Sequence, residues 1–294
     1  MPVKRKAARP AAGKATRELR WIEWIRSLER ESSPSAVPIG IGDDAAAWRV
    51  PRGEVAVLTV DTQVEGVHFR RDWLSLRQIG ARAVEASTSD VAAMAARPAG
   101  LLVSLTLPRE TTDGQLRELY AGIHAASKRC SAPILGGNLS SGPFSITITS
   151  LGSGKPNELV ERRGARPRDS IWVTGEPGLA RLGLLAHLQG LPGKLRKLDA
   201  GERRALRAAL KAFAEPRARL ELALAVAGRL RPRAMIDLSD GLAADLQHVL
   251  SESSRARGTP LGAELDEGAL VRGAAVRSLA NRLGVSAIAS VLQG

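Results

Sequence analysis

The chain has 294 residues, of which 44% are hydrophobic and 25% charged, a balance typical of globular proteins that excludes general disorder. Aromatic residues make up only 3%, too few for a surface on which single-stranded nucleic acid stacks. The single cysteine, Cys130, excludes a disulfide framework and a four-thiolate zinc site, and it fits a reducing compartment. Neither an apolar run of about 18 residues nor a secretory signal is present, so we expect a cytoplasmic protein.

The formal net charge of +13 is unevenly distributed along the chain. Residues 1–20 carry seven basic residues and one acidic residue, and residues 161–233 carry seventeen basic and seven acidic residues, so the remainder is slightly acidic. We expect residues 1–20 to form a disordered, solvated basic tail. The basic 161–233 stretch favours solubility and attracts anionic ligands at low salt. We expect neither a membrane nor a nucleic-acid partner.

Hydrophobic periodicity predicts strands that alternate with helices. Helices are predicted at 21–28, 77–95 and 112–129, and strands at 55–64, 100–108 and 144–152, with a short strand at 133–137 that ends in a glycine turn. Further on, the pattern predicts a strand and turn over 171–178 and basic helices over 179–230, interrupted near 190–193 and 216. Residues 235–250 predict a strand end, a turn and a helix capped by Ser239 or Asp240.

This alternation predicts an α/β or α+β fold. The polar, glycine-containing segment near 150–160 marks the expected boundary between an N-terminal domain (21–155) and a C-terminal α/β domain (156–294).

Five acidic sites interrupt or follow apolar segments at predicted strand ends and turns: Asp43–Asp44, Asp61, Asp90, Asp237 and Asp240. A carboxylate in such a setting is costly to bury unless it is paired or bound to a metal. Mg²⁺ prefers carboxylate oxygens and usually binds together with phosphates. The set therefore indicates a Mg²⁺–nucleotide site, although a turn or a helix cap explains any one of these residues alone.

Other motifs are less specific. Gly136–Gly137 can bring backbone N–H groups close to a phosphate, but paired glycines are common. The P-loop sequence is absent, and GIGDDA lacks the third glycine and the preceding strand of a dinucleotide fingerprint. Glu65 and His68 follow a predicted strand, where either a substrate-binding loop or a solvated loop begins. No histidine pair has zinc-ligand spacing, and no serine has a nearby base.

Taken together, six strings resemble the thiamine-monophosphate kinase family, within the superfamily that includes aminoimidazole-ribotide synthetase: GIGDDAA (40–46), LTVDTQVEGVHF (58–69), STSDVAAMAARP (87–98), ILGGN (134–138), ERRGARPRDSIWVTG (161–175) and AMIDLSDGLAADL (234–246). The resemblance runs from about residue 35 to the end of the chain. It implies a two-domain synthetase-like fold with an N-terminal mixed sheet, homodimer formation, and ATP-dependent phosphorylation of thiamine monophosphate to thiamine diphosphate.

The resemblance also implies roles for single residues. Metal-binding positions of the family match Asp44, Thr59, Asp61, Asp90, Asp237 and Asp240. Positions that contact ATP match Gly137, Asn138, Arg162 and Ser239, with Arg162 stabilising charge during the reaction, and His68 matches a substrate contact. Because the acceptor phosphate is already ionised at neutral pH, catalysis can depend on alignment and charge neutralisation by several Mg²⁺ ions and Arg162.

Three departures from the family pattern bear on this interpretation. Asn138 stands where the family usually has Asp, and Ser87–Asp90 replaces an N-L-S-D string. The sequence ends at Gly294, about where the family's G-G-E-D-Y-E-L motif begins, so the simplest interpretation is a C-terminally truncated sequence or a fragment. Two alternatives stay open: a related enzyme with another acceptor, and a non-catalytic or nucleic-acid-binding relative.

Overall fold

The computed structural model describes residues 17–29 and 36–293. Its sheet has four strands in the order β1–β4–β2–β3, namely β1 (Val55–Val64), β4 (Ser145–Gly154), β2 (Arg97–Leu107) and β3 (Ile134–Ser141). β4 is antiparallel to both β1 and β2, whereas β3 runs parallel to β2. The predicted mixed sheet with helices is confirmed.

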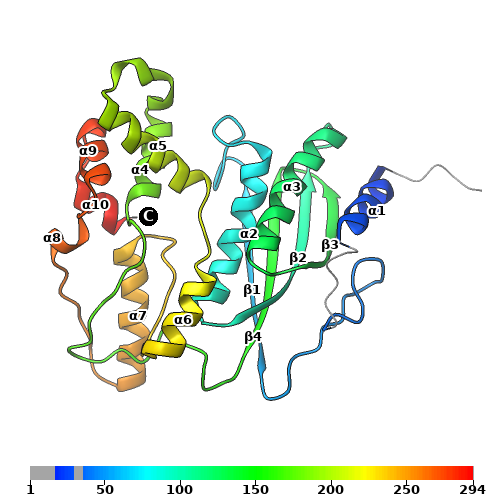
Figure 1. Ribbon diagram of the computed structural model, residues 1–294, viewed down its shortest axis with the longest axis horizontal. Helices are drawn as coiled ribbons and strands as arrows, with labels where there is room; N and C mark the ends of the chain where they lie inside the picture. The colour runs from blue at the N-terminus through cyan, green and yellow to red at the C-terminus, as the bar shows by residue number, and fades with distance from the viewer. Residues whose placement is uncertain (1–16, 30–35, 294) are drawn as a thin grey trace, which may run out of the picture.

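Two helices, α2 (Leu76–Ala93) and α3 (Asp113–Arg129), cover one face of this sheet (Figure 1). Each begins with a capping box, Ser75 with Gln78 in α2 and Thr112 with Gln115 in α3, which satisfies backbone N–H groups that the first turn leaves free. Their apolar sides and the inward side chains of the strands form the first hydrophobic core. The strand and helix predictions between residues 55 and 154 are thus confirmed to within a few residues, except at β3.

The opposite face of the sheet is open in part. Leu58 and Val60 of the edge strand β1 are 63% and 62% exposed. Val57 of the same strand points to the other face, which the helices cover, and is buried. Exposed apolar side chains that gather on one face of a strand indicate a surface made to be covered.

Helix α1 (Arg17–Glu29) begins four residues before the predicted helix, so the expectation of a disordered tail is wrong for residues 17–20. The physical reason is contact with α3: Arg17 and Trp21 both donate hydrogen bonds to Asp113. Residues 1–16, the rest of the predicted tail, lie outside the described residues.

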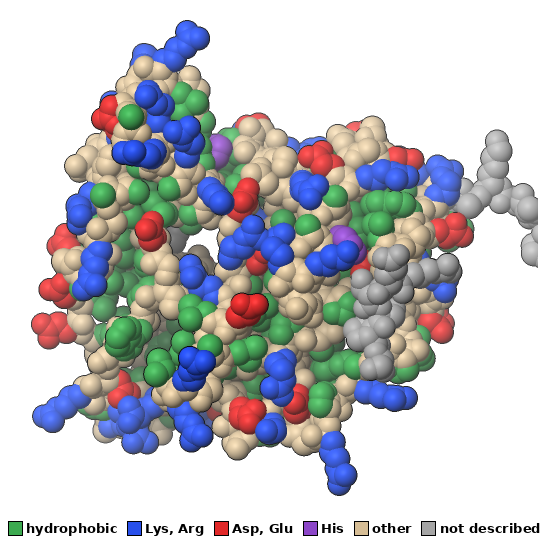
Figure 2. Space-filling view, viewed as in Figure 1, with side chains coloured by type: hydrophobic (Ala, Val, Ile, Leu, Met, Phe, Trp, Pro, Cys, Tyr) green, Lys and Arg blue, Asp and Glu red, His purple; other side chains and the backbone are tan. Residues whose placement is uncertain are grey.

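The chain after Gly154 is helical in the residues that the structure describes, with a second hydrophobic core between its helices. The elements are α4 (Leu179–Leu188), the 3₁₀ helix η2 (Leu191–Lys197), α5 (Ala200–Ala214), α6 (Leu220–Leu230), α7 (Leu242–Arg257), α8 (Glu267–Leu270), α9 (Ala274–Leu283) and α10 (Ala287–Leu292). The breaks predicted near 190–193 and 216 are confirmed. Figure 2 shows Lys and Arg side chains over much of the visible face, including the lobe that η2 and α5 form.

The strand predicted within residues 171–178 and the strand end predicted at the start of residues 235–250 are wrong, because neither segment pairs with a neighbouring strand within the described residues. A β-branched or aromatic run becomes a strand only where another backbone accepts its hydrogen bonds. The apolar side chains remain accessible instead, and Trp172 is 88% exposed. No helix in the described part of the chain is long and apolar enough to cross a membrane.

Candidate active site

Thr59, Asp61, Asp90 and Asp237 come together from three elements. Thr59 and Asp61 lie two residues apart on β1 and therefore point to the same face of the sheet. The Thr59 hydroxyl donates a 2.6 Å hydrogen bond to Asp90 of α2, the helix that covers that face. Asp237 comes from the loop that precedes α7, and its carboxylate interacts electrostatically with those of Asp61 and Asp90.

The electrostatics of this cluster favour a positively charged ligand. Burial raises the pKa of Asp61, and the carboxylates of Asp90 and Asp237 raise it further, while His68 partly opposes them. Burial also raises the pKa of Asp237, although a hydrogen bond from Ser89 lowers it. Both shifts mean that negative charge is crowded in a partly desolvated place. Such crowding is typical of functional sites, and a bound cation would relieve the repulsion between the carboxylates.

Ser89 and Asp245 belong to the same constellation but were not among the residues that the sequence selected. Asp245 is 2% exposed in the first turn of α7, and its Oδ2 accepts hydrogen bonds from the backbone N–H groups of Ser239 (3.0 Å) and Asp240 (3.2 Å). Burial raises the pKa of Asp245, and these two hydrogen bonds oppose the rise. Its signal in the sequence was a second acidic residue in the same short DGLAAD string.

The helix cap predicted at Ser239 or Asp240 is wrong. Gly241 is the N-cap of α7 and has no side chain with which to cap the helix. The carboxylate of Asp245, in the first turn of the helix, instead accepts hydrogen bonds from the backbone N–H groups of the preceding loop. The side chains of Ser239 and Asp240 are consequently left exposed ahead of the helix N-terminus. An exposed hydroxyl beside a helix N-terminus is a suitable place for a phosphate.

Arg162 lies in the exposed loop between β4 and α4. This loop is tied to the segment before α7 by the hydrogen bond from the Met235 N–H to the Glu161 carbonyl and by the Arg233–Asp169 ion pair. Gly164 allows the close approach, since its φ is +124° and a Cβ there would lie 2.4 Å from the Arg233 carbonyl oxygen. Arg162 and Asp237 are therefore carried by two segments in direct contact.

His68 stands in the turn that follows β1, with its ring exposed and its Nδ1 accepting a 3.1 Å hydrogen bond from the Val64 N–H. Because Nδ1 is the acceptor, the neutral ring carries its proton on Nε2. That nitrogen is available as a donor to a ligand beside Asp61.

Gly137 and Asn138 are not in a turn, so the prediction of a glycine turn after residue 133 is wrong. β3 continues to Ser141 and pairs in parallel with β2, where Val103 faces Gly137 and Ser104 faces Asn138. A Cβ on Gly137 would lie 1.8 Å from the Val103 carbonyl oxygen, so the sheet itself requires glycine there. Asn138 is exposed on this edge strand.

Asp44 is exposed in the segment before β1, where the Asp44 N–H donates to the Asp43 carboxylate. Among the described residues, no hydrogen bond or ion pair joins Asp44 to the cluster around Asp61. The contacts of the structure thus join Thr59, Asp61, Asp90 and Asp237, and the place of Asp44 in the site stays a prediction.

The donor chemistry of the cluster fits Mg²⁺, which binds hard carboxylate and hydroxyl oxygens. Within the described residues, however, no group of three His, Cys, Asp or Glu side chains is arranged to hold a metal ion. Mg²⁺ usually takes only one or two protein carboxylates and completes its shell with water and substrate phosphates. The arrangement fits a metal that is shared with a phosphate ligand.

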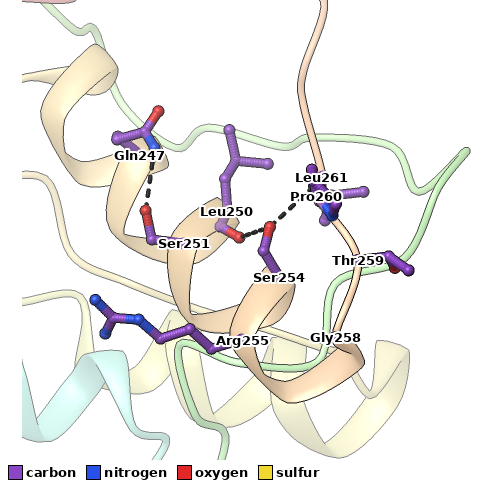
Figure 3. A pocket seen from close by; sticks show the side chains of 9 residues that line it. All are labelled: Gln247, Leu250, Ser251, Ser254, Arg255, Gly258, Thr259, Pro260 and Leu261. Atoms are coloured by element: carbon purple, nitrogen blue, oxygen red, sulfur yellow. Dashed lines mark hydrogen bonds between the residues drawn. The ribbon is translucent and has the colours of Figure 1, made fainter.

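A shallow depression of about 520 Å³ lies elsewhere, at the C-terminal end of α7 (Figure 3). Residues of α7 and of the turn after it line the depression, from Gln247 to Leu261. It contains none of the residues of the carboxylate cluster, and we assign it no part in the site.

Comparison with known proteins identifies the family and the fold of this chain. The family model "AIR synthase related protein, N-terminal domain" matches residues 42–154. The thiamine-monophosphate kinase of Rhodopirellula baltica is 34% identical over 85% of this chain and 70% of its own length. The crystal structure of thiamine-monophosphate kinase from Stenotrophomonas maltophilia K279a is 29% identical with a TM-score of 0.74, over 92% of this chain and 81% of that one.

A second structure, AaThiL complexed with AMPPCP and TMP, is 25% identical with a TM-score of 0.68, over 92% of this chain and 80% of that one. The chain spans between 46% and 73% of the length of eight curated relatives that it matches. Sequence identity, coverage and shared fold agree, and the chain belongs to the thiamine-monophosphate kinase family.

Proposed function

We propose that this protein transfers the γ-phosphoryl group of ATP to thiamine monophosphate, giving thiamine diphosphate and ADP. The observation that carries the proposal is the meeting of Thr59, Asp61, Asp90 and Asp237 beside the loops that hold Arg162 and Ser239. The relatives named as thiamine-monophosphate kinases, and the AaThiL structure complexed with AMPPCP and TMP, supply the donor and acceptor chemistry.

The residues of this chain suit direct transfer between two phosphates. A phosphate oxygen of thiamine monophosphate forms a bond to the γ-phosphorus, and the bond from that phosphorus to the β–γ bridging oxygen breaks. The acceptor oxygen is already ionised at neutral pH, so no strong base is required. Arg162 stabilises the charge on the transferred group, Ser239 with Gly137 and Asn138 contacts ATP, and His68 donates from Nε2 to the substrate.

Several Mg²⁺ ions, each shared with phosphate oxygens, would be held by the carboxylates of Asp61, Asp90, Asp237 and Asp240, with Thr59 and Asp44 as further ligands, and would neutralise phosphate charge when bound. Burial and the neighbouring carboxylates, which together raise the pKa of Asp61, support this role. Because Asn138 carries no charge, a metal ion there would bind its amide oxygen, whereas a contact to ATP can also use its NH₂ donors.

We also propose that the protein is a homodimer that pairs through the open face of the sheet. Leu58 and Val60 project from β1 with more than half of each side chain accessible, and no helix in the described residues covers them. Covering the same patch on two copies would form a self-complementary interface. The division into domains 21–155 and 156–294 and a cytoplasmic location remain predictions.

The test is a phosphoryl-transfer assay on the purified protein with ATP, MgCl₂ and thiamine monophosphate, followed by chromatography of the thiamine species. We expect thiamine diphosphate in the wild type and its loss in Asp44→Ala and Asp90→Asn. ATP binding without any thiamine diphosphate would overturn the proposal, and a panel of other phosphate acceptors would then identify the substrate class. Capture of a phosphorylated protein intermediate would contradict direct transfer.

A further inference from the structure

Helix α7 has an unusual buried face. The residues of α7 that are buried are Leu242, Asp245, Val249 and Ser253, which recur at three- and four-residue intervals and form one stripe along the helix. Two of the four are polar, although a helix face in a protein interior is normally apolar. A buried polar side chain is retained where it satisfies other buried polar groups.

Each of the two polar residues holds the backbone of a different loop. Asp245 accepts from the N–H groups of Ser239 and Asp240. Ser253, which has no exposed surface, accepts with its Oγ from the N–H groups of Gly164 (3.2 Å) and Ala165 (3.1 Å). The two side chains are eight residues apart, about 12 Å along the helix.

The loop that Ser253 holds is the one that carries Arg162. Before Arg162, the Glu161 carbonyl accepts from the Met235 N–H, and after it, Gly164 and Ala165 donate to Ser253. The backbone is thus fixed on both sides of Arg162, while the guanidinium is left exposed and makes no ion pair within the described residues. A long, exposed cation on a fixed backbone is suited to a phosphate that arrives from solution.

We infer that Ser253 is a positioning residue that sets Arg162 for the phosphates of ATP, as Asp245 on the same helix sets Ser239 and Asp240. This inference rests on the proposed function for its kinetic consequences, whereas the ordering of the two loops is independent of it. Ser253 touches no substrate and acts only through the backbone of residues 164–165.

The test compares Ser253→Ala with Ser251→Ala. Ser251 lies on the same helix, about 200° around its axis from Ser253. It accepts a 3.0 Å hydrogen bond from Gln247 (Figure 3). Thermal unfolding first establishes that both variants fold. Amide hydrogen exchange then reports on residues 164–165, and we expect faster exchange there in Ser253→Ala and no change in Ser251→Ala.

The kinetic readout separates positioning from general damage. We expect Ser253→Ala to raise the KM for ATP and to lower kcat/KM for ATP by about tenfold, with the KM for thiamine monophosphate within about twofold of wild type. In an Arg162→Ala background the same substitution should have little further effect on kcat/KM for ATP, because Ser253 acts only by positioning the Arg162 guanidinium. Ser253→Thr keeps the acceptor oxygen, so its kcat/KM for ATP should fall less than that of Ser253→Ala.

The outcomes distinguish the two proposals. Unchanged exchange at residues 164–165, or additive effects of Ser253→Ala and Arg162→Ala, would overturn the positioning role. If the wild type binds ATP but transfers no phosphoryl group to thiamine monophosphate, the proposed function fails. Hydrogen exchange and the dissociation constant of ATP in Ser253→Ala would still decide whether Ser253 orders the Arg162 loop.

Discussion

The indole ring of Trp73 and the imidazole ring of His187 stack with their centroids 5.1 Å apart and their planes 16° apart. Trp73 precedes α2 in the sheet-bearing half of the chain, and His187 belongs to α4 in the helical half. Phe213 of α5 packs against both rings. This aromatic group therefore joins the two halves, and one of its members can be protonated.

Stability should depend on pH through His187. Burial lowers the pKa of His187 below its ordinary value of 6.5, with Asp72 opposing the shift. The unfolded chain then takes up a proton more readily than the folded one, so stability is present above about pH 6.5 and is lost as the pH falls through that value. Urea unfolding of wild type and His187→Phe at pH 7.5 and 5.5 measures this.

We expect wild type to lose more stability on acidification than His187→Phe, which keeps the aromatic contact but cannot be protonated. His248, an exposed histidine of α7, provides the control. If His187→Phe and His248→Phe lose the same free energy of unfolding between pH 7.5 and 5.5, His187 is not the source of the pH dependence.

Glu85 of α2 should be a major contributor to stability. Its carboxylate is 3% exposed and accepts from Arg129 of α3, from Arg217, and from the Ala218 N–H at 2.8 Å. Glu85→Gln removes the charge and part of this network, and we expect a loss of about 2 kcal/mol in the free energy of unfolding. Denaturant titration is the measurement, with the exposed Glu118→Gln of α3 expected to change stability by less than about 0.5 kcal/mol.

The Cys130 thiol should be unreactive in the folded protein. Burial raises its pKa to about 12, and the neighbouring Glu85 carboxylate adds to the rise. Since only the thiolate reacts with disulfide reagents, labelling at pH 8 should be much slower in buffer than in denaturant. Rapid labelling of the native protein would show that the α2–α3 core opens readily.

Asp61→Asn should separate activity from stability. The raised pKa of Asp61 means that its ionised form is disfavoured in the folded state, so the amide should leave stability unchanged or increase it by up to about 1 kcal/mol. Phosphoryl transfer should fall at least about a hundredfold, because a ligand of the proposed metal is lost. A variant that is much less stable, or fully active, would contradict this assignment.

Leu58→Glu should weaken the proposed dimer. A charge in the middle of an apolar interface is costly to desolvate, so the variant should sediment as a monomer at concentrations where wild type is a dimer. Val67→Glu changes another exposed apolar residue, 75% accessible, in the turn after β1 and is the matched control. Wild type that sediments as a monomer at all concentrations would rule out the interface.

Much of the sheet-bearing half was predictable, since its signals are local. The apolar run of β1 and the helical spacing in α2 and α3 follow from patterns within one element. The extension of β3 through Gly136, Gly137 and Asn138 was not predictable, because glycine and polar residues are poor strand formers. Pairing with β2 decided it, and the Val103 carbonyl leaves no room for a side chain at residue 137.

The sequence by itself determined which chemical groups the protein has: the acidic residues at segment ends, the motifs that identify its family, and the regional excess of basic residues. Only the tertiary structure decided that Asp61, Asp90 and Asp237 meet and that Asp245 and Ser253 hold the neighbouring loops. The physical reason is that a carboxylate's neighbours, and a loop's hydrogen-bond acceptors, come from segments far away in the chain, where periodicity carries no information.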